Sequence, residues 1–334
     1  MITNSLSAAT RLPERPRTAH TAPAKPVADS APVDAVDLNP VSSERPSAKS
    51  LAQTGQDTAV QLLKVLSFNT MFDCQAGVEV IADLIRKSEA DLVGLQEVNE
   101  STEKLANSLG MHFLQQDKRT GLLSKYPIEK VSDRKYGVQV TLENGQKVAF
   151  CNAHLVSFPN QMYQLKGLTT AGGGPAISTE AQAIWWANKT RGWEFRNMIN
   201  DAESFKLPAI CTGDFNEASH LDWTPEAVAA GTQPLKVAWP GSTQYEKAGY
   251  KDAYREFHPD EVAFPGHTWT PTALPDDPEH KHDRIDFVQY RGAELSLKDV
   301  KIVGESPVTS DMVIEPYPSD HRGVLATFEV APPR

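Results

Sequence analysis

Apolar and polar residues change their spacing repeatedly along the chain, and each change indicates a new element. Residues 60–71 form a β-rich run that ends in Ser, Asn and Thr, whereas residues 77–90 carry apolar side chains at helical spacing. Residues 91–98 form a short apolar strand that ends in Gln and Glu, and residues 101–110 return to helical spacing. The pattern thus predicts strand, helix, strand and helix in succession.

Strand-like runs dominate the middle and the end of the chain. Consecutive antiparallel strands are predicted over residues 111–157, with an Asn-Gly hairpin turn between two of them. A Gly-rich insert then leads into the longest helical pattern, residues 179–205. After it come a strand over 208–212, an irregular stretch of roughly 70 residues, and three final strands over 284–291, 297–303 and 322–330.

The mixture of hairpins and crossover connections predicts the α+β class with mixed sheets rather than one parallel sheet. No internal repeat with a period of about 20 to 50 residues is present. Residues 1–58 differ from the rest because they are crowded with Ser, Thr, Ala and Pro and show no sustained periodicity. We therefore predict a disordered N-terminal extension over residues 1–58 and one folded domain over residues 59–332.

The charge of the chain is concentrated in the predicted domain. The net charge is -10, and residues 1–58 contribute nothing to it because they hold six basic and six acidic residues. An acidic body argues against a protein that grips long nucleic acid with a broad basic face. It does not exclude a phosphate substrate bridged by a metal ion, because a divalent cation reverses the local field.

The sequence carries no signal for a membrane span or for general secretion, since no apolar run approaches roughly 18 residues and the N-terminus lacks an apolar signal region. We expect a monomer that is cytoplasmic or is translocated without a general secretory signal. The basic, Ser- and Thr-rich start leaves open an organelle transit peptide or a leader for specialised export, although a plain disordered extension is favoured. The three cysteines, Cys74, Cys151 and Cys211, are expected to be reduced and mostly buried.

Polar residues recur at the ends of the apolar strands. Each alone could be a cap, a solvated edge, a satisfied buried histidine or, for Asp286, the partner of neighbouring Arg284. Together they predict a site, because strand ends in packed α/β sheets meet at one rim, where ligands bind. These residues are Asn69, Glu97, His154, Asp214, Asn216, Asp286, Asp320 and His321.

The residue types in this set suit metal-assisted hydrolysis. Carboxylate and amide oxygens are ligands for Mg²⁺ or Mn²⁺, and imidazoles transfer protons. No Cys and His spacing indicates a zinc site, and neither a Gly-x-Ser-x-Gly nor a Walker sequence is present. Hydrolysis of a phosphate ester needs such groups, because charge on the phosphate oxygens must be neutralised and a water must be aimed at phosphorus.

Seven short motifs follow one another along the chain: LSFN, GLQEV, GLLSKYPI, NAHL, TGDFNE, RIDFV and SDHRGV. In this order, over residues 61–330, the chain resembles the endonuclease/exonuclease/phosphatase superfamily, which includes deoxyribonuclease I, apurinic endonucleases, inositol polyphosphate 5-phosphatases and bacterial sphingomyelinases. Any one motif is weak, and the order of all seven carries the resemblance. It implies a catalytic domain over residues 59–332 with a deoxyribonuclease I-like, four-layer α/β sandwich, in which two mixed β-sheets pack face to face and helices flank them.

The resemblance also implies a metal site. It assigns Glu97 as the main Mg²⁺ ligand, with Asn69 beside it and Asp320 near the metal, and Mn²⁺ could take the same place. Apurinic endonucleases carry a further acid two residues after the counterpart of Asn69, but this chain has Met71 there and only Asp73 as a weak substitute. We therefore expect one tightly held metal ion.

The remaining members of the set resemble the catalytic groups of the superfamily. His321, oriented by Asp286, resembles the pair that activates water or polarises the phosphate. Asp214 and Asn216 resemble the pair that positions the nucleophile and steadies the transition state. His154 matches a second histidine of the phosphodiesterase members, which assists the leaving oxygen or holds a phosphate oxygen.

Substrate selection is expected from loops on the same rim, above all the long loop over residues 154–178 with its Gly-rich centre. Aromatic side chains in such loops could stack on a base or meet an apolar group, although packing anchors would explain the tryptophans at least as well. An arginine on the long helical pattern could reach a substrate phosphate. The candidate substrate-binding residues are His220, Trp223, His267, Trp269 and Arg196.

The sequence favours a Mg²⁺-dependent phosphoesterase, and a phosphodiesterase above a monoesterase because His154 is present. Nucleic acid remains a possible substrate, but without a basic stripe a small phosphodiester, a nucleotide or a phosphorylated head group ranks slightly higher. Two alternatives stay open: a phosphomonoesterase of the inositol polyphosphate type, and a non-catalytic interaction module or translocated effector. A decayed enzyme usually loses a catalytic residue, and here all remain, which favours the enzyme.

Overall fold

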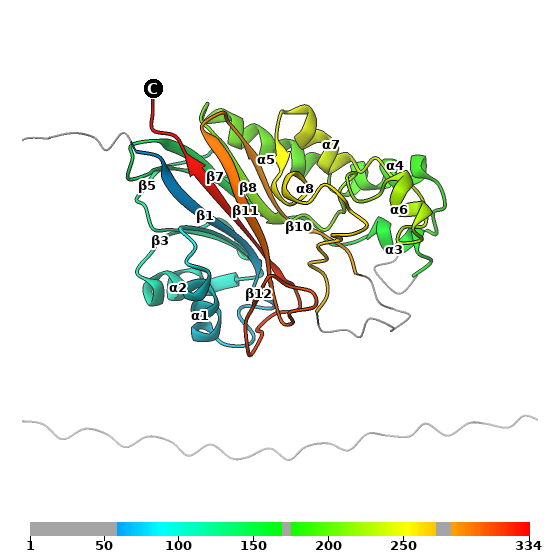
Figure 1. Cartoon of the computed structure of the whole chain (residues 1–334), viewed down its shortest axis with the longest axis horizontal. Helices are drawn as coiled ribbons and strands as arrows, with labels where there is room; N and C mark the ends of the chain where they lie inside the picture. Colours follow the sequence, from blue (N-terminus) through cyan, green and yellow to red (C-terminus); the bar gives the residue numbers. More distant parts are fainter. Residues whose placement is uncertain (1–58, 169–174, 272–281) are drawn as a thin grey trace, which may run out of the picture. The chain divides into compact units, whose positions relative to one another are not determined.

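The structure, a computed structural model, describes residues 59–168, 175–271 and 282–334. In these residues the strands form two mixed β-sheets, and helices lie on the outer face of each (Figure 1). The predicted four-layer α+β architecture is confirmed. The extension predicted over residues 1–58 lies outside the described residues.

The first sheet consists of β1 (Gln61–Asn69), β2 (Leu92–Gln96), β3 (His112–Gln115), β4 (Thr120–Ser124), β11 (Leu295–Gly304), β12 (Met312–Val313) and β13 (Gly323–Val330). Their order across the sheet is β12-β11-β13-β1-β2-β4-β3. β1 runs parallel to β2, and β11 runs parallel to β12, whereas the other neighbours are antiparallel. The parallel pair β1 and β2 therefore delivers two carboxyl ends to the same edge of the sheet.

The second sheet consists of β5 (Ile128–Val131), β6 (Gly137–Thr141), β7 (Lys147–His154), β8 (Ala209–Asp214), β9 (Lys251–Asp252) and β10 (Asp286–Arg291). Their order is β5-β6-β7-β8-β10-β9, and β7 and β8 are the parallel pair. β10 runs antiparallel to β8, which places Asp286 opposite Asp214. This register brings the start of β10 to the edge where β7 and β8 end.

Apolar side chains from both sheets interdigitate to form the central core. Val65 of β1, Phe150 of β7 and Val288 of β10 belong to this cluster and are buried, and full burial of a side chain of this size contributes roughly 1.5–3 kcal/mol. The sheets approach closely at Gly94 of β2, where a Cβ would lie 2.0 Å from Thr212 Oγ1 of β8. Glycine is therefore required there for the two sheets to pack.

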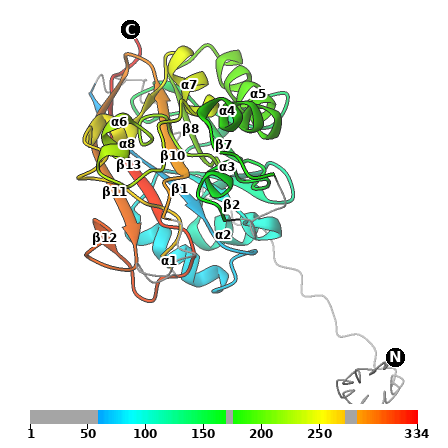
Figure 2. The ribbon, with the colours of Figure 1, turned by 90° about the vertical axis from the view of Figure 1, so that its right-hand side faces the viewer.

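Helices on the two outer faces complete the four layers (Figure 2). α1 (Val78–Ser88), η1 (Asn99–Ser101) and α2 (Thr102–Leu109) lie on the side of the first sheet, where α1 buries Ile81, Leu84 and Ile85. The helices on the side of the second sheet are α3 (Gln161–Leu165), α4 (Glu180–Thr190), α5 (Gly192–Ser204), α6 (Pro225–Ala229) and α7 (Pro240–Lys247). α8 (Ala253–Phe257) instead contacts strands of both sheets, β10 and β11, and its Ala253 and Tyr254 join the central core.

The prediction of a single long helix over residues 179–205 is wrong, because two helices, α4 and α5, occupy this segment. The chain leaves the helical conformation at Arg191 (φ -125°), which separates α4 from α5. The guanidinium of Arg191 is fully buried, where it lies 3.4 Å from Glu217 Oε2 and donates to the Val156 carbonyl oxygen at 3.0 Å. The break thus turns a charged side chain inward to an ion pair that sequence periodicity does not reveal.

The stretch predicted as irregular after β8 contains three short helices, α6, α7 and α8. Thr224 and Asp252 cap α6 and α8 with their side chains, and α6 and α7 begin with proline. Elsewhere the expectations for the cysteines are confirmed, since all three are buried and unpaired. Among the described residues, no helix has the length and apolar character to cross a membrane.

Candidate active site

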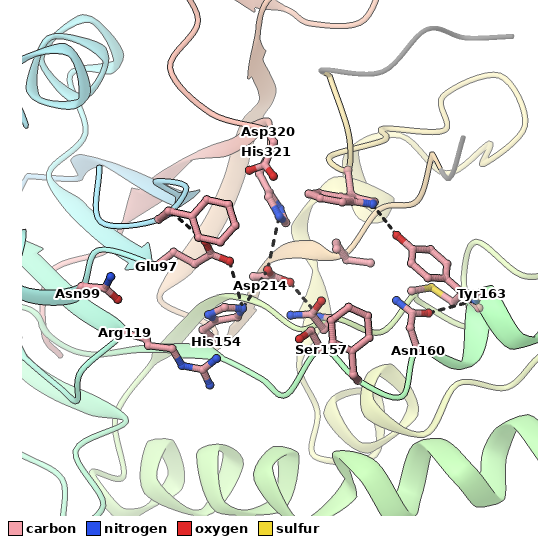
Figure 3. Close-up of a pocket in the computed structure, with 16 residues that line it drawn as sticks. Glu97, Asn99, Arg119, His154, Ser157, Asn160, Tyr163, Asp214, Asp320 and His321 are labelled. Atoms are coloured by element: carbon pink, nitrogen blue, oxygen red, sulfur yellow. Dashed lines mark hydrogen bonds and ion pairs between the residues drawn. The ribbon is translucent and has the colours of Figure 1, made fainter. Parts of the chain in front are cut away.

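Six strand ends meet at one rim between the two sheets: β1, β2, β7 and β8 end there, and β10 and β13 begin there. A cavity of about 480 Å³ opens at this rim (Figure 3). Asn69 and Asp286 are fully buried and hydrogen-bond to residues of its lining, so all eight predicted strand-end residues come together. The six that line the cavity are Glu97, His154, Asp214, Asn216, Asp320 and His321.

His321 is held between two buried carboxylates. Its Nδ1 lies 2.9 Å from Asp286 Oδ2, and its Nε2 lies 3.8 Å from Asp214 Oδ2. Burial alone would lower the pKa of His321, but the charges of Asp286 and Asp214 raise it to about 10. Burial, followed by the charge of Asp286, raises the pKa of Asp214. His321, Asp286 and Asp214 are therefore arranged so that a proton can pass between the imidazole and either carboxylate.

Asp214 is also the meeting point of three further site residues. Asn69 Nδ2 donates to its Oδ2 at 3.1 Å, and the backbone N–H of Asn216 donates to its Oδ1 at 3.0 Å. His154 Nε2 lies 3.5 Å from Asp214 Oδ2 and 3.9 Å from Glu97 Oε1. Burial lowers the pKa of His154, which favours a neutral ring at pH 7. The site thus pairs one neutral imidazole with one that holds its proton.

Two site residues occupy left-handed backbone conformations that residues other than glycine rarely adopt. Glu97 has φ 55° directly after β2, and Asn216 has φ 49° two residues after the end of β8. Backbone strain of this kind costs about 1–3 kcal/mol and clusters at functional sites. It is held here by local bonds, since Glu97 Oε2 accepts from the Phe72 N–H and Asn216 Nδ2 donates to the Leu155 carbonyl oxygen.

The donor set on the cavity wall fits a hard divalent cation. Glu97 and Asp320 both line the cavity, and burial, together with the Glu97 charge, raises the pKa of Asp320. Two carboxylates that repel each other are stabilised by a cation with a preference for oxygen ligands, such as Mg²⁺ or Mn²⁺. Asp73, the weak substitute ligand, is exposed and does not belong to the lining of the cavity.

A second group of potential ligands consists of Asp214, Asp286 and His321, whose ligand atoms lie within 4.8 Å of one another. His321 already engages Asp286 through Nδ1 and faces Asp214 through Nε2, which suits proton transfer better than metal ligation. Asp286 Oδ1 is buried and, within the described part of the chain, has no hydrogen-bond partner. It is therefore an acceptor that a bound water could satisfy.

Sequence and structure comparisons agree on the family. A family model described as "Endonuclease/Exonuclease/phosphatase family" matches residues 66–321. The chain belongs to the endonuclease/exonuclease/phosphatase family. Members of this family are hydrolases of phosphoester bonds, which agrees with the chemistry of the strand-end residues.

Relatives of this phosphoesterase family cover most of the chain. An uncharacterized protein of Caenorhabditis elegans, F14F9.5, is 26% identical over 294 residues, which cover 80% of this chain and 91% of that protein. An endonuclease/exonuclease/phosphatase from Beutenbergia cavernae is 16% identical with a TM-score of 0.54, covering 81% of this chain and 72% of that one. An AP endonuclease from Archaeoglobus fulgidus is 17% identical with a TM-score of 0.50, covering 80% and 100%. At these identities the two solved structures establish the shared fold.

Of the five predicted substrate-binding residues, Trp269 lines the cavity of this family member. Its ring centroid lies 4.7 Å from that of His321, and its Nε1 donates to the Tyr163 hydroxyl oxygen at 2.6 Å. A backbone bridge also joins Trp269 to His321. The tryptophan is thus part of the wall that holds the His321 imidazole.

The other four residues, His220, Trp223, His267 and Arg196, do not line this cavity. Trp223 is buried against Trp239, with ring centroids 5.1 Å apart, so packing explains it. His220 hydrogen-bonds to Ser242 in a separate cavity, and His267 stacks on His282. Arg196 lies on the exposed face of α5.

Several lining residues were missed by the sequence reasoning. Arg119 lies in the turn between β3 and β4, where no periodicity marks it, and Phe72 lies in the loop after β1. The sequence predicts that the loop over residues 154–178 lies at the rim, but it does not indicate which side chains of this loop line the cavity. The missed residues are Phe72, Asn99, Arg119, Ser157, Phe158, Asn160, Met162, Tyr163 and Ile285.

Proposed function

We propose that the protein is a Mg²⁺-dependent phosphodiesterase. The observation that carries this proposal is the convergence on Asp214: His321, bound to Asp286, and His154 both direct Nε2 toward Asp214 Oδ2, in a cavity that Glu97 and Asp320 also line. Two imidazoles and a pair of carboxylates around one cavity support binding of a metal ion together with one phosphate group.

Each group has a role in the proposed reaction. Glu97 and Asp320, with Asn69 nearby, would hold Mg²⁺, which would supply positive charge to the phosphate oxygens. Asp214 accepts a proton from the attacking water, since its carboxylate lies at the centre of the site, and the Asn216 N–H holds that carboxylate in place. His321 donates to a phosphate oxygen through Nε2 while Asp286 fixes the ring through Nδ1.

A diester is preferred to a monoester for two reasons. His154 provides a second imidazole beside Asp214, and its neutral ring can donate a hydrogen bond to a phosphate oxygen or to the leaving-group oxygen. Arg119 is the one Arg or Lys among the lining residues of the described chain, which suits one negative charge better than the two of a monoester. The net charge of -10 likewise favours a small substrate over long DNA or RNA.

Hydrolysis of a small panel tests the proposal: bis(p-nitrophenyl) phosphate, p-nitrophenyl phosphate, plasmid DNA and RNA, each with Mg²⁺, Mn²⁺ or EDTA. We expect cleavage of the small diester above the monoester, loss of activity in EDTA, and at least about a 100-fold lower kcat for Glu97→Gln. Glu103→Gln, at an exposed acid on α2, is the matched control and should retain full activity. Hydrolysis that survives EDTA, or no hydrolysis by folded protein with Mg²⁺, contradicts the proposal.

A further inference from the structure

The two ends of the catalytic cavity differ in chemistry (Figure 3). Asn99 and Arg119 lie at one end, and Tyr163 and Asn160 lie at the other, with Asp214 between them. The second end is apolar, because Met162, Ile285 and Trp269 pack in one cluster with Tyr163 and line the cavity with it. Phe158, two residues before Asn160, lines the same cavity. We call these five side chains the aromatic wall: Phe158, Met162, Tyr163, Trp269 and Ile285. A substrate with one charged and one apolar side would match this asymmetry.

The aromatic wall is a built surface and not a loose loop. The Trp269 indole donates to the Tyr163 hydroxyl oxygen at 2.6 Å, and the backbone of Trp269 is bridged to Asp283 and His321. Asn160 caps α3 by accepting from the Tyr163 N–H at 3.2 Å. The two rings are therefore oriented before any ligand arrives, which lowers the entropic cost of binding.

Large aromatic rings stand exposed at the mouth of the same cavity. The relative exposure is 53% for Phe158 on the wall and 66% for Phe72. The Phe72 N–H donates to Glu97 Oε2, so this second ring stands beside the proposed metal ligand. Exposed aromatic surface next to a cavity gains from being covered by an apolar ligand, and ring-on-ring contact adds to that gain.

The cations near the wall are already engaged. Lys166 Nζ lies 2.9 Å from Asp283 Oδ1, and Arg191 is paired with Glu217. Among the lining residues that the structure describes, Arg119 supplies the one permanent positive charge, and it lies at the opposite end. The wall therefore disfavours a second phosphate and favours an uncharged group.

We propose that one ester group of the substrate is an uncharged aromatic ring that packs against the aromatic wall, with Phe158 as a specificity-determining residue. The inference rests on the proposed phosphodiesterase function. A nucleobase and another aryl group share this chemistry, since either presents a planar apolar face next to a single phosphodiester.

Isothermal titration calorimetry with Mg²⁺ tests the proposal independently of turnover. The probes are dimethyl, dibutyl and diphenyl phosphate, which carry the same charge, and thymidine 5′-methyl phosphate. We expect diphenyl phosphate to bind at least about ten-fold more tightly than dimethyl phosphate, which is about 1.4 kcal/mol, with dibutyl phosphate in between. Thymidine 5′-methyl phosphate binding as tightly as diphenyl phosphate assigns a nucleobase, and binding like dimethyl phosphate assigns another aryl group.

Phe158→Ala should reduce the advantage of diphenyl phosphate to less than about three-fold while leaving dimethyl phosphate binding unchanged, because dimethyl phosphate has no ring to place on the wall. Phe264→Ala is the matched control, because Phe264 is 48% exposed and does not line the cavity. Equal binding of all diesters, or tighter binding of dibutyl phosphate, overturns the aromatic specificity even if hydrolysis is confirmed. If no diester binds and none is hydrolysed, the phosphodiesterase function fails and the inference fails with it.

Discussion

At the scale of single residues, the site depends on a buried carboxylate that has no arginine or lysine beside it in the described structure. Asp214 is 1% exposed, and its nearest potential cations are His321 and His154, at 3.8 and 3.5 Å. Such a carboxylate exchanges protons readily, because burial disfavours its charge and each imidazole can supply a proton. The chemistry of the site therefore belongs to the group and not to one residue.

His321→Asn and Asp286→Asn should each lower kcat for bis(p-nitrophenyl) phosphate by about 10²–10⁴-fold, because each disrupts the oriented imidazole. The double variant should be no slower than the slower single variant, since residues that act as a unit are not additive. Steady-state kinetics with a melting curve for each variant measures this. Multiplicative losses in the double variant would contradict the pairing. His220→Asn is the control and should keep wild-type kcat, because His220 lies in a separate cavity.

The residue types of the site were predictable from sequence, whereas the orientation of the loop aromatics was not. Strand pairing determines where strand-end residues such as Asn69 and Asp214 lie, and the apolar pattern predicts the strands. Trp223 and Trp269 occur in similar polar loops, yet one is buried against Trp239 and the other faces His321. Tertiary packing decides between these outcomes, and local sequence carries no signal for it.

At the scale of elements, the sequence predicts the positions of the strands better than those of the helices that cover the second sheet. Parallel pairs such as β7 and β8 follow from apolar runs with a crossover between them, and His154 and Asp214 are directly paired at their ends. The break between α4 and α5 was missed because its cause, the ion pair of Arg191 with Glu217, joins segments 26 residues apart. Periodicity reports local spacing only, so a buried charge that interrupts a helix is invisible to it.

A buried ion network fixes α8 against the start of β10. Asp222 accepts from Arg255 Nε at 2.6 Å and from Arg284 Nε at 3.0 Å, and Asp252 accepts from Arg284 Nη1 at 3.0 Å. Arg284 lies two residues before Asp286, so the network also supports the end of β10 that carries Asp286. Burial would raise the pKa of Asp222, but the two guanidinium groups hold it below its usual value of 3.8.

Asp222→Asn should therefore lower the free energy of unfolding at pH 7 by about 3–5 kcal/mol, because the buried guanidinium of Arg255 loses its carboxylate partner and that of Arg284 keeps only Asp252. A lowered carboxyl pKa stabilises the fold above the unfolded value of 3.8 and stops doing so as the pH falls through the folded value. The difference from wild type should thus shrink below pH 3.8. Urea unfolding at pH 7 and pH 3 measures this, and a difference independent of pH would contradict it.

The matched control for this network is the exposed pair of Lys298 and Glu329, whose Nζ and Oε2 lie 2.6 Å apart with side chains 44% and 42% exposed. Glu329→Gln should change the free energy of unfolding by less than about 1 kcal/mol, because solvent screens an exposed pair. If Glu329→Gln lowered the free energy of unfolding as much as Asp222→Asn does, burial of the Asp222 network would not explain the effect of Asp222→Asn.

At the scale of the whole molecule, catalysis is expected to be a property of the two-sheet unit alone. Among the residues that the structure describes, the lining of the cavity runs from Phe72 to His321, and deletion of residues 1–58 leaves all of these in place. Residues 1–58 also carry balanced charges, and the net charge of -10 that a phosphate ester meets is unchanged by the deletion. We expect kcat/KM for bis(p-nitrophenyl) phosphate within about two-fold of the full chain, with the same dependence on salt concentration. A rate more than about ten-fold lower would instead mean that residues 1–58 contribute directly to the substrate site, since neither charge nor the cavity lining could account for it.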